Sequence, residues 1–131
     1  MPLVHLVIAL ALGEFLLFGW AVGQARTRYH VPAPATTGNE TFERYFRVQM
    51  NTLEQLVIFV PSIVMFAHFW SPVIAAALGA LFIIGRGMYF YGYTRSAQGR
   101  HLGFMVSSLP NLALLVGSIA GAIHALITHG L

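Results

Sequence analysis

Long apolar stretches dominate this chain and leave it few ways to fold. Of its 131 residues, 57% are hydrophobic and only 8% are charged. That is far more apolar surface than a soluble domain of this size needs. The chain has room for about four membrane-spanning helices and short connections between them. We therefore expect an all-α integral membrane protein, a four-helix bundle that forms a single transmembrane domain over residues 1–131.

Proline, glycine and polar clusters mark the ends of the expected spans. The spans fall at residues 3–22, 42–70, 73–93 and 102–127, with a loop at residues 26–39. We expect Asn39 to cap the second span, and Ser71 followed by Pro72 to begin the third. The second span is about 43 Å long as a helix, so its polar first half must lie at or beyond the membrane interface.

Every basic residue is an arginine, and the seven arginines gather around two of the three connections. The first group is Arg26, Arg28, Arg44 and Arg47, and the second is Arg86, Arg95 and Arg100. In a four-span bundle these two connections share one side of the membrane. The positive-inside rule makes that side cytoplasmic and places both termini on the opposite side. Arginine presents a rigid fork of donors, which suits carboxylates and phosphates better than the point charge of lysine.

A polar stripe runs down the start of the second span. Arg44, Arg47, Asn51 and Glu54 recur at helical spacing and share one narrow face. Charged groups carried into a membrane are costly unless they meet a partner or a ligand, so the stripe is a candidate functional site. The alternative is an intramembrane ion pair that only locks the packing of the helices.

The third span offers a second polar face at the same membrane level. Arg86, Tyr89 and Tyr93 are spaced i, i+3 and i+7, and Arg100 joins them if the helix continues through residues 94–98. Arginines from two helices, with a carboxylate and an amide between them, suit a small polyanion that also carries an ammonium group. The alternative places these tyrosines in an aromatic belt at the membrane interface.

Two segments resemble a known family. FERYFRVQMNTLEQ (residues 42–55) and MYFYGYTRSAQGR (residues 88–100) look like the MAPEG family of membrane glutathione enzymes, most of all the branch with leukotriene C synthase and the microsomal glutathione transferases. The resemblance implies a homotrimer of four-helix subunits that binds glutathione between neighbouring subunits near the cytoplasmic interface. It also implies a glutathione S-transferase, with or without glutathione peroxidase activity, that acts on lipophilic electrophiles from the bilayer.

The resemblance also assigns roles to single residues. It places the glutathione contacts at Arg26, Arg47, Gln49, Asn51, Glu54, Tyr89, Tyr93 and Arg100. Arg100 would stabilise the glutathione thiolate, and Tyr93 would donate a hydrogen bond to the same sulfur. A free thiol is only a few per cent ionised at neutral pH, and lowering its pKa by about two units corresponds to about 2.7 kcal/mol. Gln49 lies off the stripe, on the opposite side of its helix, which fits a site between subunits.

Two positions depart from the pattern of leukotriene C synthase. Gln55 stands where that enzyme has a tyrosine, which removes one implied contact. Thr27 stands where it has a second arginine, proposed to assist epoxide opening. The second difference argues against leukotriene synthesis and favours a broader transferase.

Two other functions are alternatives. A non-catalytic lipid-binding scaffold of the same fold need not bind glutathione. Glu14, in the middle of the first span, suggests a small multidrug transporter. Such a transporter exports cations, however, and the positive charge of seven arginines at one interface would repel them. Glu14 is otherwise interpreted as a buried acid, protonated and hydrogen-bonded inside the trimer.

Other ligand classes find little support in the sequence. The chain has no cysteine, and its histidines lack the spacing of metal ligands, so we predict no metal site. No run of basic residues suggests a nucleic-acid partner.

Overall fold

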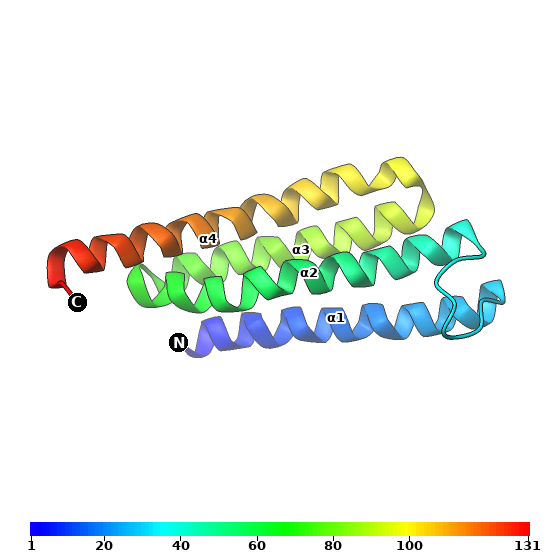
Figure 1. Cartoon of the computed structure of the whole chain (residues 1–131), viewed down its shortest axis with the longest axis horizontal. Helices are drawn as coiled ribbons and strands as arrows, with labels where there is room; N and C mark the ends of the chain where they lie inside the picture. Colours follow the sequence, from blue (N-terminus) through cyan, green and yellow to red (C-terminus); the bar gives the residue numbers. More distant parts are fainter.

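The computed structural model describes all 131 residues as a bundle of four long helices without β-strands (Figure 1). The helices are α1 (Pro2–Tyr29), α2 (Glu40–Phe69), α3 (Pro72–Arg95) and α4 (Arg100–His129), with a 3₁₀ turn, η1 (Ala97–Gly99), before the last. All four helices are long and apolar enough to cross a membrane. The expected all-α membrane bundle is therefore confirmed.

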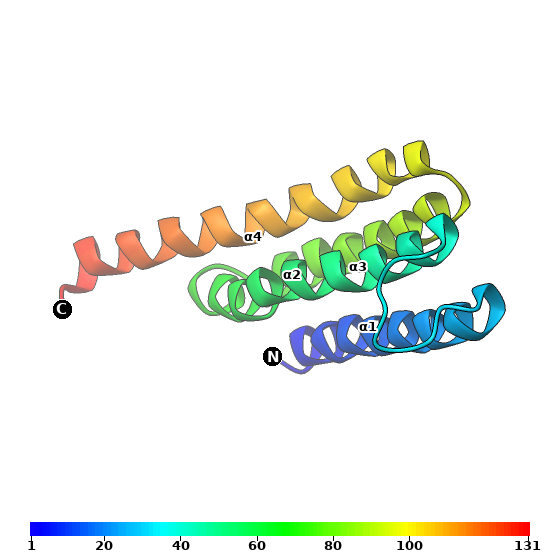
Figure 2. The ribbon, with the colours of Figure 1, turned by 45° about the vertical axis from the view of Figure 1, so that its right-hand side comes forward.

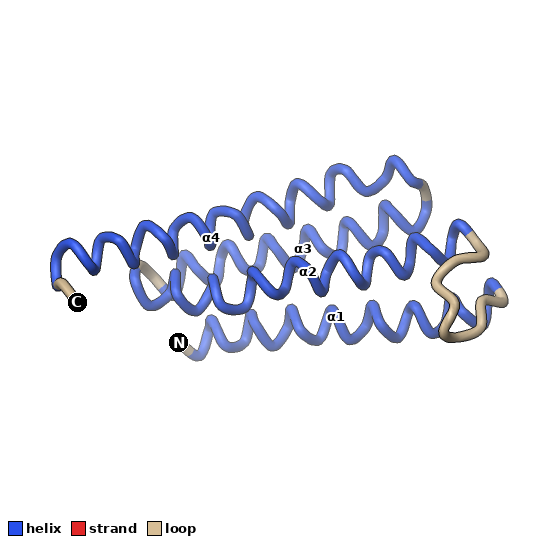
Figure 3. The backbone as a smooth tube through the Cα atoms, viewed as in Figure 1, coloured by secondary structure: helices blue, strands red, loops and turns tan.

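The connections divide between the two ends of the bundle. The α1–α2 loop and the α3–α4 turn lie at one end, whereas both termini and the short α2–α3 connection lie at the other (Figures 1 and 3). α4 projects past the other helices at its C-terminal end (Figure 2). This arrangement brings the arginine-bearing connections to one end.

Capping residues determine where α2 and α3 begin, as the sequence predicted. The backbone N–H of Phe42 donates to Asn39 Oδ1 at 2.9 Å, and the backbone N–H of Ile74 donates to Ser71 Oγ at 3.2 Å. Each contact satisfies an amide that has no partner inside its own helix. Pro72 occupies the first turn of α3, where a missing N–H costs nothing.

α1 is longer than predicted. The sequence predicted a span that ends at residue 22 and a loop that begins at residue 26, but the helix continues to Tyr29. Val22 and Ala25 pack with Phe42 in a small buried cluster, which stabilises the additional turns. His30 then ends the helix in the left-handed conformation, with φ of 58°. The first arginines of the chain therefore lie on a helix rather than in a loop.

Glycines allow α3 and α4 to pack closely at the end that holds the arginines. A Cβ atom on Gly103 would collide with the backbone of Tyr89, and one on Gly85 would collide with the backbone of Ser107. Small residues at such contacts let the backbones of membrane helices approach one another. The close packing places the second half of α3 directly against the start of α4.

Candidate functional site

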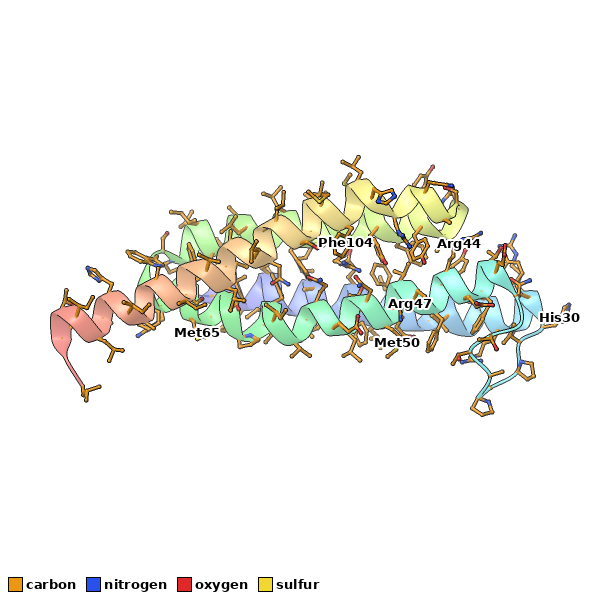
Figure 4. The ribbon with its side chains drawn as sticks, turned by 45° about the horizontal axis from the view of Figure 1, so that its top comes forward. His30, Arg44, Arg47, Met50, Met65 and Phe104 are labelled. Atoms are coloured by element: carbon orange, nitrogen blue, oxygen red, sulfur yellow. The ribbon has the colours of Figure 1, made fainter.

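A cleft of about 360 Å³ opens near the end of the bundle where α3 turns into α4. We call it the polar cleft; it is lined by Arg47 and Asn51 from α2, Tyr89 and Tyr93 from α3, and Arg100, His101 and Phe104 from α4. Figure 4 shows Arg47 on α2 and Phe104 on α4, the two helices that flank it. The polar faces of α2 and α3, which the sequence predicted to converge, thus share one space, and the start of α4 contributes to it as well.

Arg100 reaches the polar cleft by a chain reversal. α3 ends at Arg95, and Ser96 has an extended backbone with φ of −159°, so the helix does not continue to Arg100. The backbone N–H of Gly99 donates to Ser96 Oγ at 3.1 Å and stabilises the 3₁₀ turn. Arg100 then begins α4, with its Cζ atom 5.7 Å from the centre of the Tyr93 ring. The sequence predicted that Arg100 would share the face of Tyr93 if the helix continued to it; the helix ends at Arg95, and the turn brings Arg100 close to Tyr93 instead.

Aromatic rings form one wall of the polar cleft. The centres of the Tyr89 and Tyr93 rings lie 5.4 Å apart, and the ring of Phe104 lies 6.3 Å from that of Tyr89. Tyr89 is only 5% exposed, so the surrounding helices hold its ring in place. The cleft therefore combines a rigid aromatic wall with two guanidinium groups, those of Arg47 and Arg100.

Arg86 does not face the polar cleft, contrary to the prediction from its spacing. It is fully buried, at 0% exposure, and donates hydrogen bonds to Asn51 Oδ1 at 2.8 Å, Thr52 Oγ1 at 3.2 Å and Ser107 Oγ at 3.2 Å. Its Cζ atom also lies 4.3 Å from the centre of the Tyr89 ring. A guanidinium group buried without such partners would be very costly. Arg86 is therefore a structural residue that links α2, α3 and α4.

Three of the glutathione contacts implied by the resemblance are outside the polar cleft of their own chain. Arg26 donates to the backbone carbonyl of Ala35 at 2.7 Å and so holds the α1–α2 loop. Gln49 lines a separate groove of about 450 Å³, together with Trp20 from α1. Glu54 is exposed and does not line the cleft. A single chain therefore presents the implied residues on more than one face.

His101 lines the polar cleft although the sequence pattern did not single it out. It directly follows Arg100 at the start of α4, and that adjacency was the available signal. The histidines of the chain lack the spacing of metal ligands, so their pattern gave no reason to place His101 in the site. Its position adds an imidazole to a site that otherwise holds guanidinium, amide and phenol groups.

Comparisons with known proteins bear on the family to which the chain belongs. The model of the MAPEG family matches residues 4–120. The chain is 48% identical over 114 residues to an uncharacterized protein of Synechocystis sp., covering 87% of this chain and 83% of that protein. It is 42% identical over 103 residues to microsomal glutathione S-transferase 2 of Mus musculus, covering 75% of this chain and 70% of the relative.

Leukotriene C4 synthase of Rattus norvegicus is also similar, at 38% identity over 103 residues, covering 79% of this chain and 68% of that enzyme. The family match covers α2 and α3 in full, most of α1 and α4, and every residue of the polar cleft. The four apolar helices make the protein an integral, multi-pass membrane protein. On this evidence the chain belongs to the MAPEG family.

Proposed function

We propose that the protein is a membrane glutathione S-transferase that conjugates lipophilic electrophiles, with or without an accompanying glutathione peroxidase activity. Family membership and the similarity to microsomal glutathione S-transferase 2 support an enzyme of the glutathione transferase type. The observation that carries the proposal is the polar cleft, in which Arg47 and Arg100 converge from different helices. Glutathione is an acidic tripeptide, and guanidinium groups bind carboxylates through paired, charge-assisted hydrogen bonds.

The charge of the polar cleft favours an anion. No carboxylate is among its lining residues, so nothing within the cleft neutralises Arg47 and Arg100. Both arginines are exposed, and their guanidinium groups are accessible to a ligand from the aqueous side. An anionic ligand would supply the missing counter-charge at a site close to the low dielectric of the membrane.

Asn51 enters this site as a hydrogen-bond donor. Its Oδ1 atom already accepts a hydrogen bond from Arg86 at 2.8 Å. The Nδ2 group is therefore the end of the amide that remains for a ligand, and it can donate to a carboxylate or a peptide carbonyl. Arg86 lies outside the cleft, but its hydrogen bond to Asn51 determines which end of the Asn51 amide faces a ligand.

Arg100 stabilises the glutathione thiolate in this mechanism. The thiolate is the nucleophile, and its sulfur forms a bond to the electrophilic carbon. With an aryl halide the halide departs with its electron pair; with an unsaturated aldehyde the carbon–carbon π electrons move to the carbonyl oxygen, and the resulting enolate takes up a proton from water. The guanidinium group of Arg100 lies beside the Tyr93 ring, so a positive charge and a phenol are close together. The fixed charge favours the ionised sulfur, and Tyr93 donates a hydrogen bond to it.

Two of the remaining implied contacts, Arg26 and Gln49, come from neighbouring copies in a homotrimer. Arg26 and Gln49 lie away from the polar cleft of their own chain, and a second copy would bring them to it. Glu54 follows Asn51 by three residues on the same helix face and is exposed, so a ligand that extends beyond the cleft can reach it with its ammonium group. Glutathione would thus lie between subunits.

The site faces the cytoplasm in this proposal. The polar cleft lies at the end of the bundle that holds the arginine-bearing connections, and both termini lie at the opposite end (Figure 1). The positive-inside rule assigns the arginine-rich end to the cytoplasm, where glutathione enters from water. The apolar co-substrate enters from the bilayer.

Titration of glutathione into the purified protein, followed by calorimetry and by thiolate absorbance, tests this function. We expect binding with a thiolate signal in the parent protein. Arg100→Ala should lose that signal and lower the conjugation of an aryl halide at neutral pH by about 20-fold, because the thiol returns to its ordinary ionisation. Arg95→Ala is the matched control, since Arg95 packs over Tyr91 outside the cleft and should change neither measurement.

The alternatives have distinct outcomes in this experiment. A parent protein that does not bind glutathione would exclude the transferase and support the non-catalytic lipid-binding scaffold. Full conjugation by Arg100→Ala, with binding intact, would show that the role of Arg100 is wrong while the transferase function stands.

A further inference from the structure

A second groove, of about 280 Å³, lies between α2 and α4 and adjoins the polar cleft. We call it the inner groove; it is lined by Gln55, Ile58, Phe104, Ser108, Leu109, Asn111, Leu112 and Leu115. Phe104 lines both spaces, so the inner groove continues directly from the polar cleft. Apolar side chains make up most of its surface, and three polar side chains interrupt it.

The polar side chains of the inner groove are incompletely paired. Asn111 is 2% exposed, and its Nδ2 group donates to Gln55 Oε1 at 2.8 Å, whereas its Oδ1 atom is buried without a hydrogen-bond partner. Ser108 Oγ is also buried and unpartnered. By contrast, Ser107 and Ser118 on the same helix both bond to neighbouring groups. Buried polar atoms without partners are rare in folded proteins, so each of these two oxygens calls for a group that completes its hydrogen bonding.

The two unpartnered oxygens, Ser108 Oγ and Asn111 Oδ1, have complementary hydrogen-bonding capacity. Ser108 and Asn111 are three residues apart on α4, so they share one face of the helix. Asn111 Oδ1 can only accept a hydrogen bond, and Ser108 Oγ can donate one. A ligand hydroxyl satisfies both, because its single oxygen donates one hydrogen bond and accepts another. A carbonyl cannot donate to Asn111, and an alkyl chain can pair with neither residue.

We propose that the inner groove binds the tail of the lipophilic co-substrate and that Ser108 and Asn111 recognise a hydroxyl group on that tail. This inference deepens the proposed glutathione transferase function, because it specifies the class of electrophile: a long apolar chain hydroxylated away from its reactive carbon. The occupant is not a cation, since no acidic side chain lines the groove.

The position of the hydroxyl follows from the helix geometry. Along α4, Ser108 and Asn111 lie about 12 to 17 Å from Arg100, at about 1.5 Å per residue. If Arg100 holds the reacting sulfur, the recognised hydroxyl lies far along the chain and deeper in the membrane. A hydroxyl next to the reactive carbon would remain in the polar cleft and would not reach Asn111.

Substrate pairs test the inference kinetically. The probes are a long-chain unsaturated aldehyde with a hydroxyl at the far end of its tail, and the same aldehyde without that hydroxyl. We expect the parent protein to prefer the hydroxylated probe by about tenfold in kcat/KM, which is the effect of satisfying one or two buried groups. Ser108→Ala should reduce this preference, and Ser108→Ala combined with Asn111→Leu should abolish it. Equal kcat/KM values for the two probes in the parent protein would overturn the inference.

Matched variants separate recognition of the hydroxyl from loss of packing. Leu112→Ala removes an apolar lining residue of the same groove and should lower kcat/KM for both probes equally. Ser108→Ala on its own removes only one hydroxyl, so it keeps the test informative even if Asn111→Leu disturbs the fold through Gln55. A shift in preference that is as large in Leu112→Ala as in Ser108→Ala would contradict the proposed role of the hydroxyl.

A binding measurement distinguishes failure of this inference from failure of the glutathione function. A long-chain alkanediol and the corresponding alcohol, neither of which reacts with a thiol, are each used to displace a fluorescent apolar dye from the protein in lipid nanodiscs without glutathione. Stronger displacement by the diol, lost in Ser108→Ala, supports the inner groove even if no conjugation is found. Active conjugation with no preference between these ligands overturns the inner groove and leaves the transferase standing. A change of oligomeric state in Ser108→Ala, without a change in preference, would instead assign the groove to a contact between copies.

Discussion

The Nη2 group of Arg86 donates a hydrogen bond to Oδ1 of Asn51 at 2.8 Å, and this contact joins the buried interior of the bundle to the polar cleft. On the interior side, Arg86 also bonds to Thr52 of α2 and Ser107 of α4. On the cleft side, Asn51 lies beside Arg47 and Tyr89. The packing of the helices and the geometry of the proposed ligand site therefore depend on one guanidinium group.

Replacing Arg86 with leucine should destabilise the bundle. The change removes the hydrogen bonds to Asn51, Thr52 and Ser107 and leaves these groups without their partner. We expect a loss of about 3 kcal/mol in the free energy of unfolding, which thermal unfolding in detergent would measure as a lower Tm. Arg86→Lys should be intermediate, because an ammonium group keeps the charge but not the planar fork. Arg95→Leu, at an exposed arginine, is the control and should leave Tm unchanged. An equally unchanged Tm in Arg86→Leu would show that the buried hydrogen bonds do not contribute to stability.

Replacing Asn51 with aspartate should separate stability from ligand binding. The new carboxylate still accepts the hydrogen bond from Arg86 and adds an ionic attraction to it, so Tm should stay the same or rise. It also loses the Nδ2 donor and places a negative charge in the polar cleft. We therefore expect glutathione affinity, measured by calorimetry, to fall by about tenfold or more. Tight glutathione binding by Asn51→Asp would exclude Asn51 as a donor to the ligand.

Adding a methyl group at Gly103 should disturb the site through the α3–α4 contact. The new Cβ atom would collide with the backbone of Tyr89, which cannot move without shifting α3. We expect Gly103→Ala to lower stability by about 1–3 kcal/mol and to weaken glutathione binding by displacing the aromatic wall. Gly13→Ala is the control, because a Cβ atom there meets nothing within 4 Å. Equal Tm values for the two variants would contradict the close packing.

The sequence predicted the features that depend on local rules. Apolar length gave the four helices, and the caps at Asn39 and Ser71 are confirmed because a cap is a contact within a few residues. The converging faces of α2 and α3 also followed from spacing, which is why Asn51 and Tyr89 were expected in one site.

Features that depend on tertiary packing were beyond the sequence. Arg86 and Tyr93 share a helical face, but α2 and α4 both contact Arg86 and bury it, whereas Tyr93 lies where the cleft opens. Spacing alone cannot show where neighbouring helices cover a face. The route of Arg100 depended on the chain reversal at Ser96, which a helical extrapolation misses. Tertiary contacts likewise extended α1 past its predicted end.

A shared site between subunits predicts a specific pattern of cross-links. The chain has no cysteine, so introduced thiols are unique. Gln49 and Tyr93 line different spaces in one chain, and the proposed trimer brings Gln49 of one copy near Tyr93 of the next. A Gln49→Cys, Tyr93→Cys variant treated with a short bifunctional maleimide should therefore give covalent dimers and trimers on a denaturing gel. Glutathione should slow the reaction by occupying the site.

The control pair, Gln49→Cys with Tyr91→Cys, uses an exposed side chain outside the polar cleft and should remain monomeric. Monomers alone from the first pair, in membranes where the protein is folded, would place the glutathione site within one subunit instead.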